Sequence, residues 1–197
     1  LAEKGFQILA WDPNAKNVED LKAGNITISE PHLTNLLSKN TANIKFVRSC
    51  SELKNADVIY IASDTPTDET NSSDLSLVNK IIEFVLNCLE KDTVLVILSQ
   101  VPPGFTKSIN VPGCRLFYQV ETLVLGEAVN RFLDPERFII GCENPSKEIH
   151  PRLATVLKKF NCPVLTMSYE SAEIAKISIN SILTSQVLSL IHISEPT

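Results

Sequence analysis

Short apolar runs alternate with segments of helical periodicity along most of the chain. The nearly continuous apolar runs at 57–62 and 93–98 are typical of strands buried on both faces of a parallel sheet. Together with shorter runs they predict strands at 6–11, 44–47, 57–62, 93–98, 116–119, 138–141 and 163–166. Strands that alternate with helices predict an α/β domain with a doubly wound, mainly parallel sheet.

The segments between these strands repeat their apolar residues every three or four positions, which predicts helices. The expected helices span 14–23, 31–38, 51–55, 74–90 and 147–160. The same spacing predicts the helical side chains that face the core, namely Val18, Leu21, Leu77, Ile81, Val85 and Leu89. Leu1 to Lys4 is expected to end a short helix, with Gly5 in the left-handed position that follows it.

The composition is that of an ordinary globular domain. The 197 residues are 44% hydrophobic and 21% charged, which allows one full domain with a sizeable core. The net charge of −5 provides no basic surface, so we expect neither a nucleic-acid partner nor an anionic membrane. We also expect no transmembrane segment and no signal peptide.

The cysteines are odd in number and widely spaced, without a C-x-x-C pair. They are Cys50, Cys88, Cys114, Cys142 and Cys162. Zinc requires clustered ligands, and the chain has only three histidines, so no metal site is expected. The cysteines are interpreted as small, reduced hydrophobic side chains in a cytoplasmic protein.

Asp12 ends the first predicted strand, where a carboxylate can accept hydrogen bonds from the ribose hydroxyls of a dinucleotide. In dinucleotide-binding folds this acid follows a Gly-rich phosphate loop by about 20 residues, so that loop and the first strand are expected to precede Leu1. No arginine follows Asp12 to bind a 2′-phosphate, which favours NAD over NADP. An Asp-Pro turn at the start of a helix is the alternative explanation for Asp12.

Polar residues also follow the two long apolar strands. Thr65 comes after one of them, and Ser99 and Gln100 come after the other. Ligands of doubly wound sheets bind in the crevice at the carboxyl ends of the strands, so we expect Asp12, Thr65 and Ser99 to line one crevice. Ordinary turn chemistry is the alternative explanation for these residues.

A single carboxylate, Glu121, lies in the apolar stretch after the predicted strand at 116–119. Desolvation penalises such a carboxylate unless it has a partner or a chemical task. Lys176 and Asn180 share one face of a helix that is apolar or small on nearly every side, and we expect this helix to be buried. A solvated loop glutamate and a solvated lysine are the alternatives, but the three residues together favour one shared site.

The chain divides into three segments by this reasoning. Residues 1–167 are expected to form a truncated nucleotide-binding domain, and 168–187 are expected to begin a further helix. Residues 188–197 match the in-frame translation of a transposon-based sequencing adaptor, so they are excluded from the fold. A simple continuation of the helix is the alternative for this last segment.

Six short blocks occur in one characteristic order. They are ISEP at 28–31, ADVIYIASDTP at 56–66, DLS at 74–76, SQVPPG at 99–104, the Glu121 block at 118–141, and AEIAKISIN at 172–180. Each block alone is a weak signal, but the order resembles the UDP-glucose/GDP-mannose dehydrogenase family. The resemblance implies a Rossmann-type NAD domain in an enzyme that oxidises the C6 alcohol of a nucleotide sugar to a carboxylate. It also implies that 168–187 begin the helix that links this domain to the central domain.

The resemblance also implies roles for individual residues. Glu121 matches the acid–base glutamate, which works through a water. Lys176 and Asn180 match residues that stabilise negative charge on the reacting C6 oxygen. The next residues, Thr122 and Leu123, are expected to contact the substrate. The four cofactor residues are expected to be Asp12, Thr65, Ser99 and Gln100.

The chain departs from the family pattern at three positions. Gln100 replaces a threonine, Leu125 replaces a second glutamate, and Val124 replaces a polar residue, which implies altered substrate or cofactor contacts. None of the five cysteines occupies the context of the family's nucleophilic cysteine. The chain by itself is therefore expected to be inactive, and the complete protein is expected to be a homo-oligomer.

Other functions are compatible with the same residues. The substrate is a UDP-glucose type of nucleotide sugar in the leading interpretation, and a UDP-N-acetylhexosamine or a GDP-mannose derivative in the alternative. A non-catalytic nucleotide-binding module and a dehydrogenase for small hydroxy acids are more distant alternatives. The presence of Glu121, Lys176 and Asn180 beside Asp12 speaks against the non-catalytic module, and the Glu121 block speaks against the hydroxy-acid dehydrogenase.

Overall fold

The computed structural model describes residues 1–26, 28–66 and 73–194, and only the backbone at residue 50 and at 187–194. Within these residues seven strands form. They are β1 (Ile8–Ala10), β2 (Ile44–Phe46), β3 (Val58–Ile61), β4 (Val94–Ile97), β5 (Leu116–Val120), β6 (Phe138–Cys142) and β7 (Val164–Ser168). Each lies within one or two residues of a predicted strand.

Helices lie between most of these strands, as predicted, but the helix at 128–133 was not predicted, and only 3₁₀ turns lie between β4 and β5. The α-helices are α1 (Ala15–Lys22), α2 (Leu33–Lys39), α3 (Cys50–Leu53), α4 (Ser76–Leu86), α5 (Ala128–Leu133), α6 (Pro151–Lys158) and α7 (Tyr169–Ser194). Short 3₁₀ turns are η1 (Ala2–Lys4), η2 (Thr41–Asn43), η3 (Thr106–Ser108) and η4 (Gly113–Arg115). The left-handed Gly5 after η1, with φ 89°, is confirmed.

The strands belong to two sheets. A two-stranded sheet pairs β1 with β2, and a five-stranded sheet has the order β3-β4-β5-β6-β7. Every pair of neighbours is parallel except β5 with β6, which is antiparallel. The predicted α/β fold with a mainly parallel sheet is therefore confirmed.

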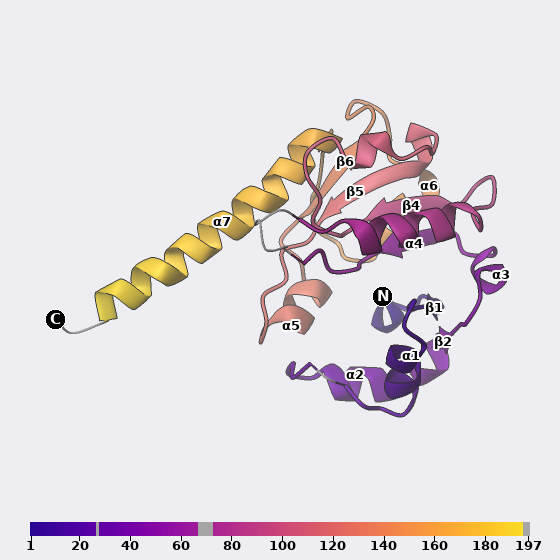
Figure 1. Cartoon of the computed structure of the whole chain (residues 1–197), viewed down its shortest axis with the longest axis horizontal. Coiled ribbons are helices and arrows are strands. Elements are labelled where there is room, and N and C mark those ends of the chain that lie inside the picture. The colour runs from indigo at the N-terminus through magenta and orange to yellow at the C-terminus, as the bar shows by residue number, and fades with distance from the viewer. Residues whose placement is uncertain (27, 67–72, 195–197) are drawn as a thin grey trace.

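Helices cover both faces of the larger sheet (Figure 1). Strand β4 is completely buried, and its side chains alternate between two clusters because successive residues of a strand point to opposite faces. Leu95 and Ile97 pack on the face covered by α4 and the first turns of α7, whereas Val94 and Val96 pack on the face covered by α6. This explains why the sequence of β4 is apolar without alternation.

An apolar groove separates the two sheets. It encloses about 670 Å³ and is lined by β1 on one side, by β3 on the other, and by Val156 of α6. The edges of β1 and β3 that face this groove carry no strand among the described residues. One strand inserted between them would join both sheets into the single doubly wound sheet that the sequence predicts.

Two helical residues predicted to face the core are exposed instead. Leu21 is 40% exposed, because α1 packs on a sheet of only two strands and buries only Val18. Leu77 is 42% exposed and lines a cavity at the carboxyl ends of the strands. In α4 the predicted Ile81 and Val85 are buried.

The predicted burial of the last helix is wrong for most of its length. Only the first turns of α7 lie on the sheet, and the helix then projects away from the body (Figure 1). Ile174 is 51% exposed and Ile182 is 58% exposed. The backbone of α7 continues through 188–194, whereas 195–197 lie outside the described residues, so the adaptor interpretation stays a prediction.

The cysteines differ in state. Cys142 is a buried free thiol whose pKa is raised mainly by desolvation, Cys162 is a half-buried free thiol, and Cys114 is exposed. Cys88 is buried as expected, but it is disulfide-bonded. The expectation of reduced cysteines throughout is therefore wrong at Cys88.

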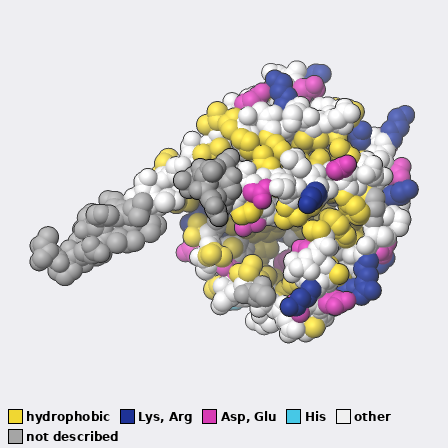
Figure 2. All heavy atoms as spheres, viewed as in Figure 1, with side chains coloured by type: hydrophobic (Ala, Val, Ile, Leu, Met, Phe, Trp, Pro, Cys, Tyr) yellow, Lys and Arg dark blue, Asp and Glu magenta, His cyan; other side chains and the backbone are white. Residues whose placement is uncertain are grey.

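Charged side chains are mixed over the surface. On the face shown in Figure 2, lysine and arginine side chains are scattered among acidic and neutral ones and do not gather into a stripe. Among the described residues, no helix combines the length and the apolar character that a membrane crossing requires.

Helix α7 packs closely on the sheet at Gly141. This glycine in β6 lies under the start of the helix, beside Ala172 and Tyr169. The Tyr169 hydroxyl donates a hydrogen bond to the Leu116 carbonyl at 2.8 Å, which fastens the same turn to β5. The absence of a side chain at Gly141 therefore sets the distance between helix and sheet.

Replacing Gly141 with alanine is expected to destabilise the fold by about 1–3 kcal/mol, as overpacking of dense cores does. The new Cβ would lie 2.9 Å from the Cβ of Ala172 and 3.2 Å from the Cα of Tyr169, so α7 would have to shift. Thermal unfolding of the complete protein measures the loss. Val164→Ala, at an exposed position of β7, is the control, and equal midpoints for the two variants would contradict the argument.

Candidate active site

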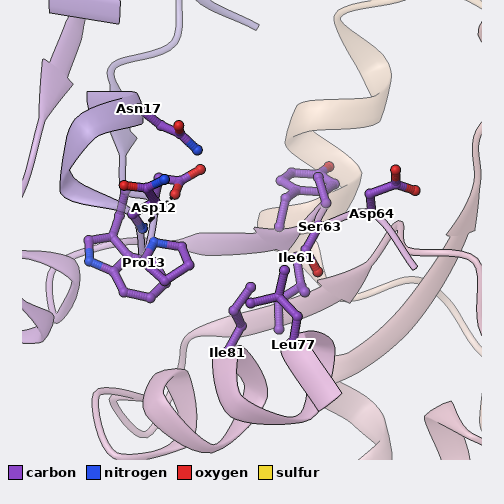
Figure 3. A pocket seen from close by; sticks show the side chains of 12 residues that line it. Asp12, Pro13, Asn17, Ile61, Ser63, Asp64, Leu77 and Ile81 are labelled. Carbon is purple, nitrogen blue, oxygen red and sulfur yellow. Dashed lines mark hydrogen bonds between the residues drawn. The ribbon is translucent and has the colours of Figure 1, made fainter. Parts of the chain in front are cut away.

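A cavity opens at the carboxyl ends of β1 and β3. It encloses about 700 Å³. In Figure 3, Asp12, Pro13 and Asn17 lie on one side of it, and Ser63 and Asp64 lie across from them. Leu77 and Ile81 of α4 form its apolar floor, which explains the exposure of Leu77. The cavity has the polar rim and apolar body that a nucleoside requires.

Asp12 takes part in a turn and still has an oxygen for a ligand. Its Oδ1 accepts a hydrogen bond from the Asn14 amide at 2.7 Å, and Asn14 in turn caps α1 by accepting from the Lys16 amide at 3.1 Å. Among the described residues, no hydrogen bond occupies the second carboxylate oxygen of Asp12. The turn is therefore compatible with the predicted ribose-binding role of Asp12.

A stacked aromatic pair holds the wall of this cavity. The rings of Trp11 and Phe84 are 4.4 Å apart between centroids and are tilted by only 6°. Trp11 precedes Asp12, and Phe84 belongs to α4, so the stack fixes the end of β1 against the larger sheet's helix.

The loops after β3 and β4 lie side by side. The Ser99 hydroxyl donates to the Ser63 carbonyl at 2.7 Å, and the Thr65 hydroxyl donates to the Gln100 carbonyl at 2.8 Å. Of the predicted cofactor residues, however, only Asp12 lines the cavity described above. Thr65, Ser99 and Gln100 form the neighbouring loops instead, and the expectation of one crevice shared by Asp12, Thr65 and Ser99 is not met by this cavity.

Sequence reasoning assigned only Asp12 to this cavity and missed, among others, two polar residues on its far side. Ser63 and Asp64 follow β3 directly and come before the predicted Thr65. Their position immediately after a buried strand was the available signal.

Two of the three predicted catalytic residues, Lys176 and Asn180, lie on α7 and contact the loops after β5 and β4. The Lys176 ammonium donates a hydrogen bond to the main-chain carbonyl of Glu121, which directly follows β5. The Asn180 amide donates to Oε1 of Gln100, after β4, at 2.6 Å. One helix therefore contacts both loops through the side chains that the sequence singled out.

Burial perturbs both charges of this group. Desolvation raises the pKa of Glu121 above its usual range, and the nearby Lys176 charge opposes this shift. Desolvation lowers the pKa of Lys176, and the Glu121 charge opposes that shift. An acid and a base with pKa values moved toward neutrality are suited to proton transfer.

The loop that follows Glu121 presents its side chains to solvent. The predicted substrate residues Thr122 and Leu123 are exposed, and Leu125 is 81% exposed. Glu121 itself is only half-buried. The loop therefore offers a surface for a substrate without enclosing one.

Glu30 holds this loop from a distant part of the chain. Its carboxylate accepts hydrogen bonds from the Gly126 amide at 2.7 Å and the Val129 amide at 3.3 Å. Sequence reasoning had no role for Glu30, although the block at 28–31 contains it. Among the described residues, no cluster of histidine, cysteine, aspartate or glutamate has the arrangement of a metal site.

A parallel sheet with a carboxylate after β1 and a cavity at the carboxyl ends of its strands defines a nucleotide-binding α/β domain. Residues 1–161 match the NAD binding domain of the UDP-glucose/GDP-mannose dehydrogenase family. The chain belongs to this family. The match confirms the predicted family and the predicted NAD cofactor.

Individual relatives agree with this assignment. The chain is 31% identical to an uncharacterised protein of Methanocaldococcus jannaschii over 95% of its own length and 22% of that protein. It is 29% identical to the UDP-glucose 6-dehydrogenase TuaD of Bacillus subtilis, over 94% of the chain and 42% of the relative. The chain thus spans less than half the length of these relatives.

A solved structure supports the fold. The GDP-mannose dehydrogenase of Pseudomonas aeruginosa superposes with a TM-score of 0.84 at 19% identity, over 94% of this chain and 46% of that one. At this identity the likeness concerns the fold alone.

Replacing Glu121 with glutamine is expected to raise the unfolding midpoint at pH 8 and to change it little below about pH 4. The raised pKa of Glu121 means that its neutral form favours folding, and this contribution is lost as the pH rises through the folded-state pKa. Thermal unfolding of the complete protein at pH 4, 6 and 8 measures the difference. Glu127→Gln, in the exposed part of the same loop, is the control, and a pH-independent difference for E121Q would contradict the assignment.

Proposed function

We propose that the complete protein oxidises the C6 alcohol of a nucleotide sugar with NAD, and that this chain supplies the NAD-binding domain and part of the active site. The observation that carries the proposal is the contact of Lys176 with Glu121, together with that of Asn180 with Gln100. They support the proposal because Lys176 and Asn180 of α7 contact the two loops that follow β5 and β4, where Glu121 and Gln100 lie.

The cofactor is expected to lie along the carboxyl ends of the strands. Asp12 has an oxygen available for ribose hydroxyls, and the cavity beside it has an apolar floor for a base. NAD, when bound, supplies the acceptor for the hydride that leaves C6. The family match to an NAD binding domain supports NAD as the cofactor.

Three residues of the chain have roles in the transfer of the C6 alcohol proton and in the stabilisation of the negative charge that develops on the oxygen. Glu121, directly or through a water, accepts the proton of the C6 alcohol. The Lys176 ammonium has three N–H donors, and one of them is used on the Glu121 carbonyl, so two remain for an oxygen that gains negative charge. Asn180 can add a second donor, because the contact with Gln100 uses only one of its amide hydrogens.

The sugar and the base belong to the proposal as well. The leading substrate is a UDP-glucose type of nucleotide sugar, and a UDP-N-acetylhexosamine or a GDP-mannose derivative is the alternative. Turnover assays with these substrates would distinguish them.

A non-catalytic binding module is a different class of function, and NAD binding without turnover of any nucleotide sugar would favour it. We further propose that the protein is cytoplasmic, which rests on the free thiols of Cys114, Cys142 and Cys162, and that the complete protein is a homo-oligomer.

Lys176→Ala is expected to lower kcat in the complete protein by roughly 10²–10³, the usual loss when a preorganised donor to a developing oxyanion is removed. The substrate KM should change less, because the charge develops only as the alcohol loses its proton. Lys80→Ala, on the exposed face of α4, is the control and should retain wild-type kcat. An unchanged kcat for K176A would remove Lys176 from the mechanism.

Asp12→Ala is expected to weaken NAD binding by roughly 10–100-fold, since hydrogen bonds to a charged group contribute about 1.5–3 kcal/mol. It should also narrow the preference for NAD over NADP, because the carboxylate repels a 2′-phosphate. The second acid of the cavity, Asp64, should keep part of that preference. Titration of both cofactors measures this, with exposed Asp92→Ala as the control. Equal use of NAD and NADP by the wild type would contradict the role of Asp12.

A further inference from the structure

Glu173 is a charged residue that is completely buried in the described structure. Its exposed fraction is 0%, and it belongs to the turn of α7 that packs on the sheet. One carboxylate oxygen accepts from the Gly104 amide at 2.6 Å, and the other accepts from the Thr106 amide at 2.8 Å. Both oxygens therefore hold main-chain donors of one loop.

Burial of a carboxylate is unfavourable unless strong contacts replace its hydration. None of the ion pairs found among the described residues includes Glu173. Its two short contacts with main-chain amides are charge-assisted hydrogen bonds, which are stronger than those between neutral groups. The loop that supplies these amides is therefore fixed at two points, and its position depends on Glu173.

This loop is the one that carries Gln100. It leaves the sheet at the end of β4 and reaches η3 at Thr106. The Gln100 side chain, near its start, accepts from Asn180, whereas Glu173 holds its far end. Asn180 and Glu173 of α7 thus form hydrogen bonds with opposite ends of the loop 99–106.

Glu173 and Asn180 lie on the same face of α7 as Lys176. Positions 173, 176 and 180 are separated by three and then four residues, which places them on one side of α7. Each contacts a different main-chain or side-chain group beyond the helix, namely the Gly104 loop end, the Glu121 carbonyl and the Gln100 amide.

We propose that Glu173 is a positioning residue of the active site, which acts by fixing the loop 99–106 on α7 so that Gln100 orients the Asn180 amide. The Gln100 oxygen then holds one Asn180 hydrogen, and the second hydrogen is directed to the reacting oxygen. Gln100 is also where the chain departs from the family pattern, so the proposal gives this departure a function. It rests on the proposed dehydrogenase activity.

Two other polar groups, the hydroxyls of Thr106 and Tyr118, are buried near Glu173. Burial, and in second place the Glu173 charge, raise the pKa of the Tyr118 phenol. The Thr106 and Tyr118 hydroxyl oxygens are buried and have no protein partner among the described residues. The two amides are therefore the contacts that hold the carboxylate.

The test compares two glutamates of α7 that both contact the η3 region. Glu173→Gln removes the charge and one of the two acceptors, so one amide loses its partner. Glu170→Gln is the matched control, because Glu170 contacts the same region through a solvent-exposed ion pair with Lys107, at 3.1 Å, and not through buried hydrogen bonds to the Gly104 and Thr106 amides. Hydrogen exchange of the peptide that contains Gly104 and Thr106 reports the position of the loop, and steady-state kinetics of the complete protein report the site.

E173Q is expected to speed exchange at the Gly104 and Thr106 amides and to lower kcat by roughly 10-fold with little change in substrate KM, the pattern of a contact made in the transition state. The losses should not multiply in the double variant with Gln100→Ala, since both act through Asn180. E170Q should match the wild type in kcat. Glu173→Asp keeps the charge but reaches only one amide, and it should show smaller changes in the same direction if E173Q does not fold.

Three results would overturn the proposal. Faster exchange with an unchanged kcat in E173Q would make Glu173 a purely structural contact. Losses that multiply with those of Q100A would show that Glu173 does not act through Gln100. A wild-type complete protein without turnover of any nucleotide sugar would overturn the proposed function, and this inference with it, whereas the first two results leave that function intact.

Discussion

The seating of the first turns of α7 on β5 and β6 is the contact on which the site depends. It is possible because Gly141 has no side chain and Ala172 has a small one, so the helix lies directly on the strands. The same turns then carry Glu173 and Lys176 to loops that leave the sheet at different strands. A displacement of α7 would move both contacts at once. The packing of α7 on the sheet therefore determines the positions of Glu173 and Lys176 relative to these loops.

Much of the fold could be predicted from the sequence because its signals are local. Buried strands such as β4 are nearly continuous apolar runs, and the residues after them are visible as breaks in the pattern. Glu173 and Glu30 could not be assigned in this way, since each contacts amides 67 or more residues away along the chain. The exposed outer part of α7 was mispredicted because periodicity cannot tell a buried helix from one whose apolar surface has no partner within the described chain.

The charged forms of Glu121 and Lys176 do not stabilise the folded protein. Burial shifts the pKa of both Glu121 and Lys176 toward neutrality, so each charged form is less favourable in the folded protein than in water. They are also not a direct ion pair, since the Lys176 ammonium is bound by the main-chain carbonyl of Glu121. The Glu121 carboxylate is consequently left available for a ligand, which is the arrangement expected of a base and less so of a structural contact.

Two contacts connect the small sheet to the rest of this site. The Trp11–Phe84 stack fixes the end of β1 beside Asp12, and Glu30 holds the loop that begins at Glu121. The cofactor side and the substrate side of the proposed site are therefore joined through the N-terminal part of the chain, although the groove between β1 and β3 separates the sheets themselves. A strand that paired with both β1 and β3 would fill that groove and join the two sheets. Such pairing would fix the distance between Asp12 and Glu121, so the geometry of the proposed site depends on how the two sheets are joined.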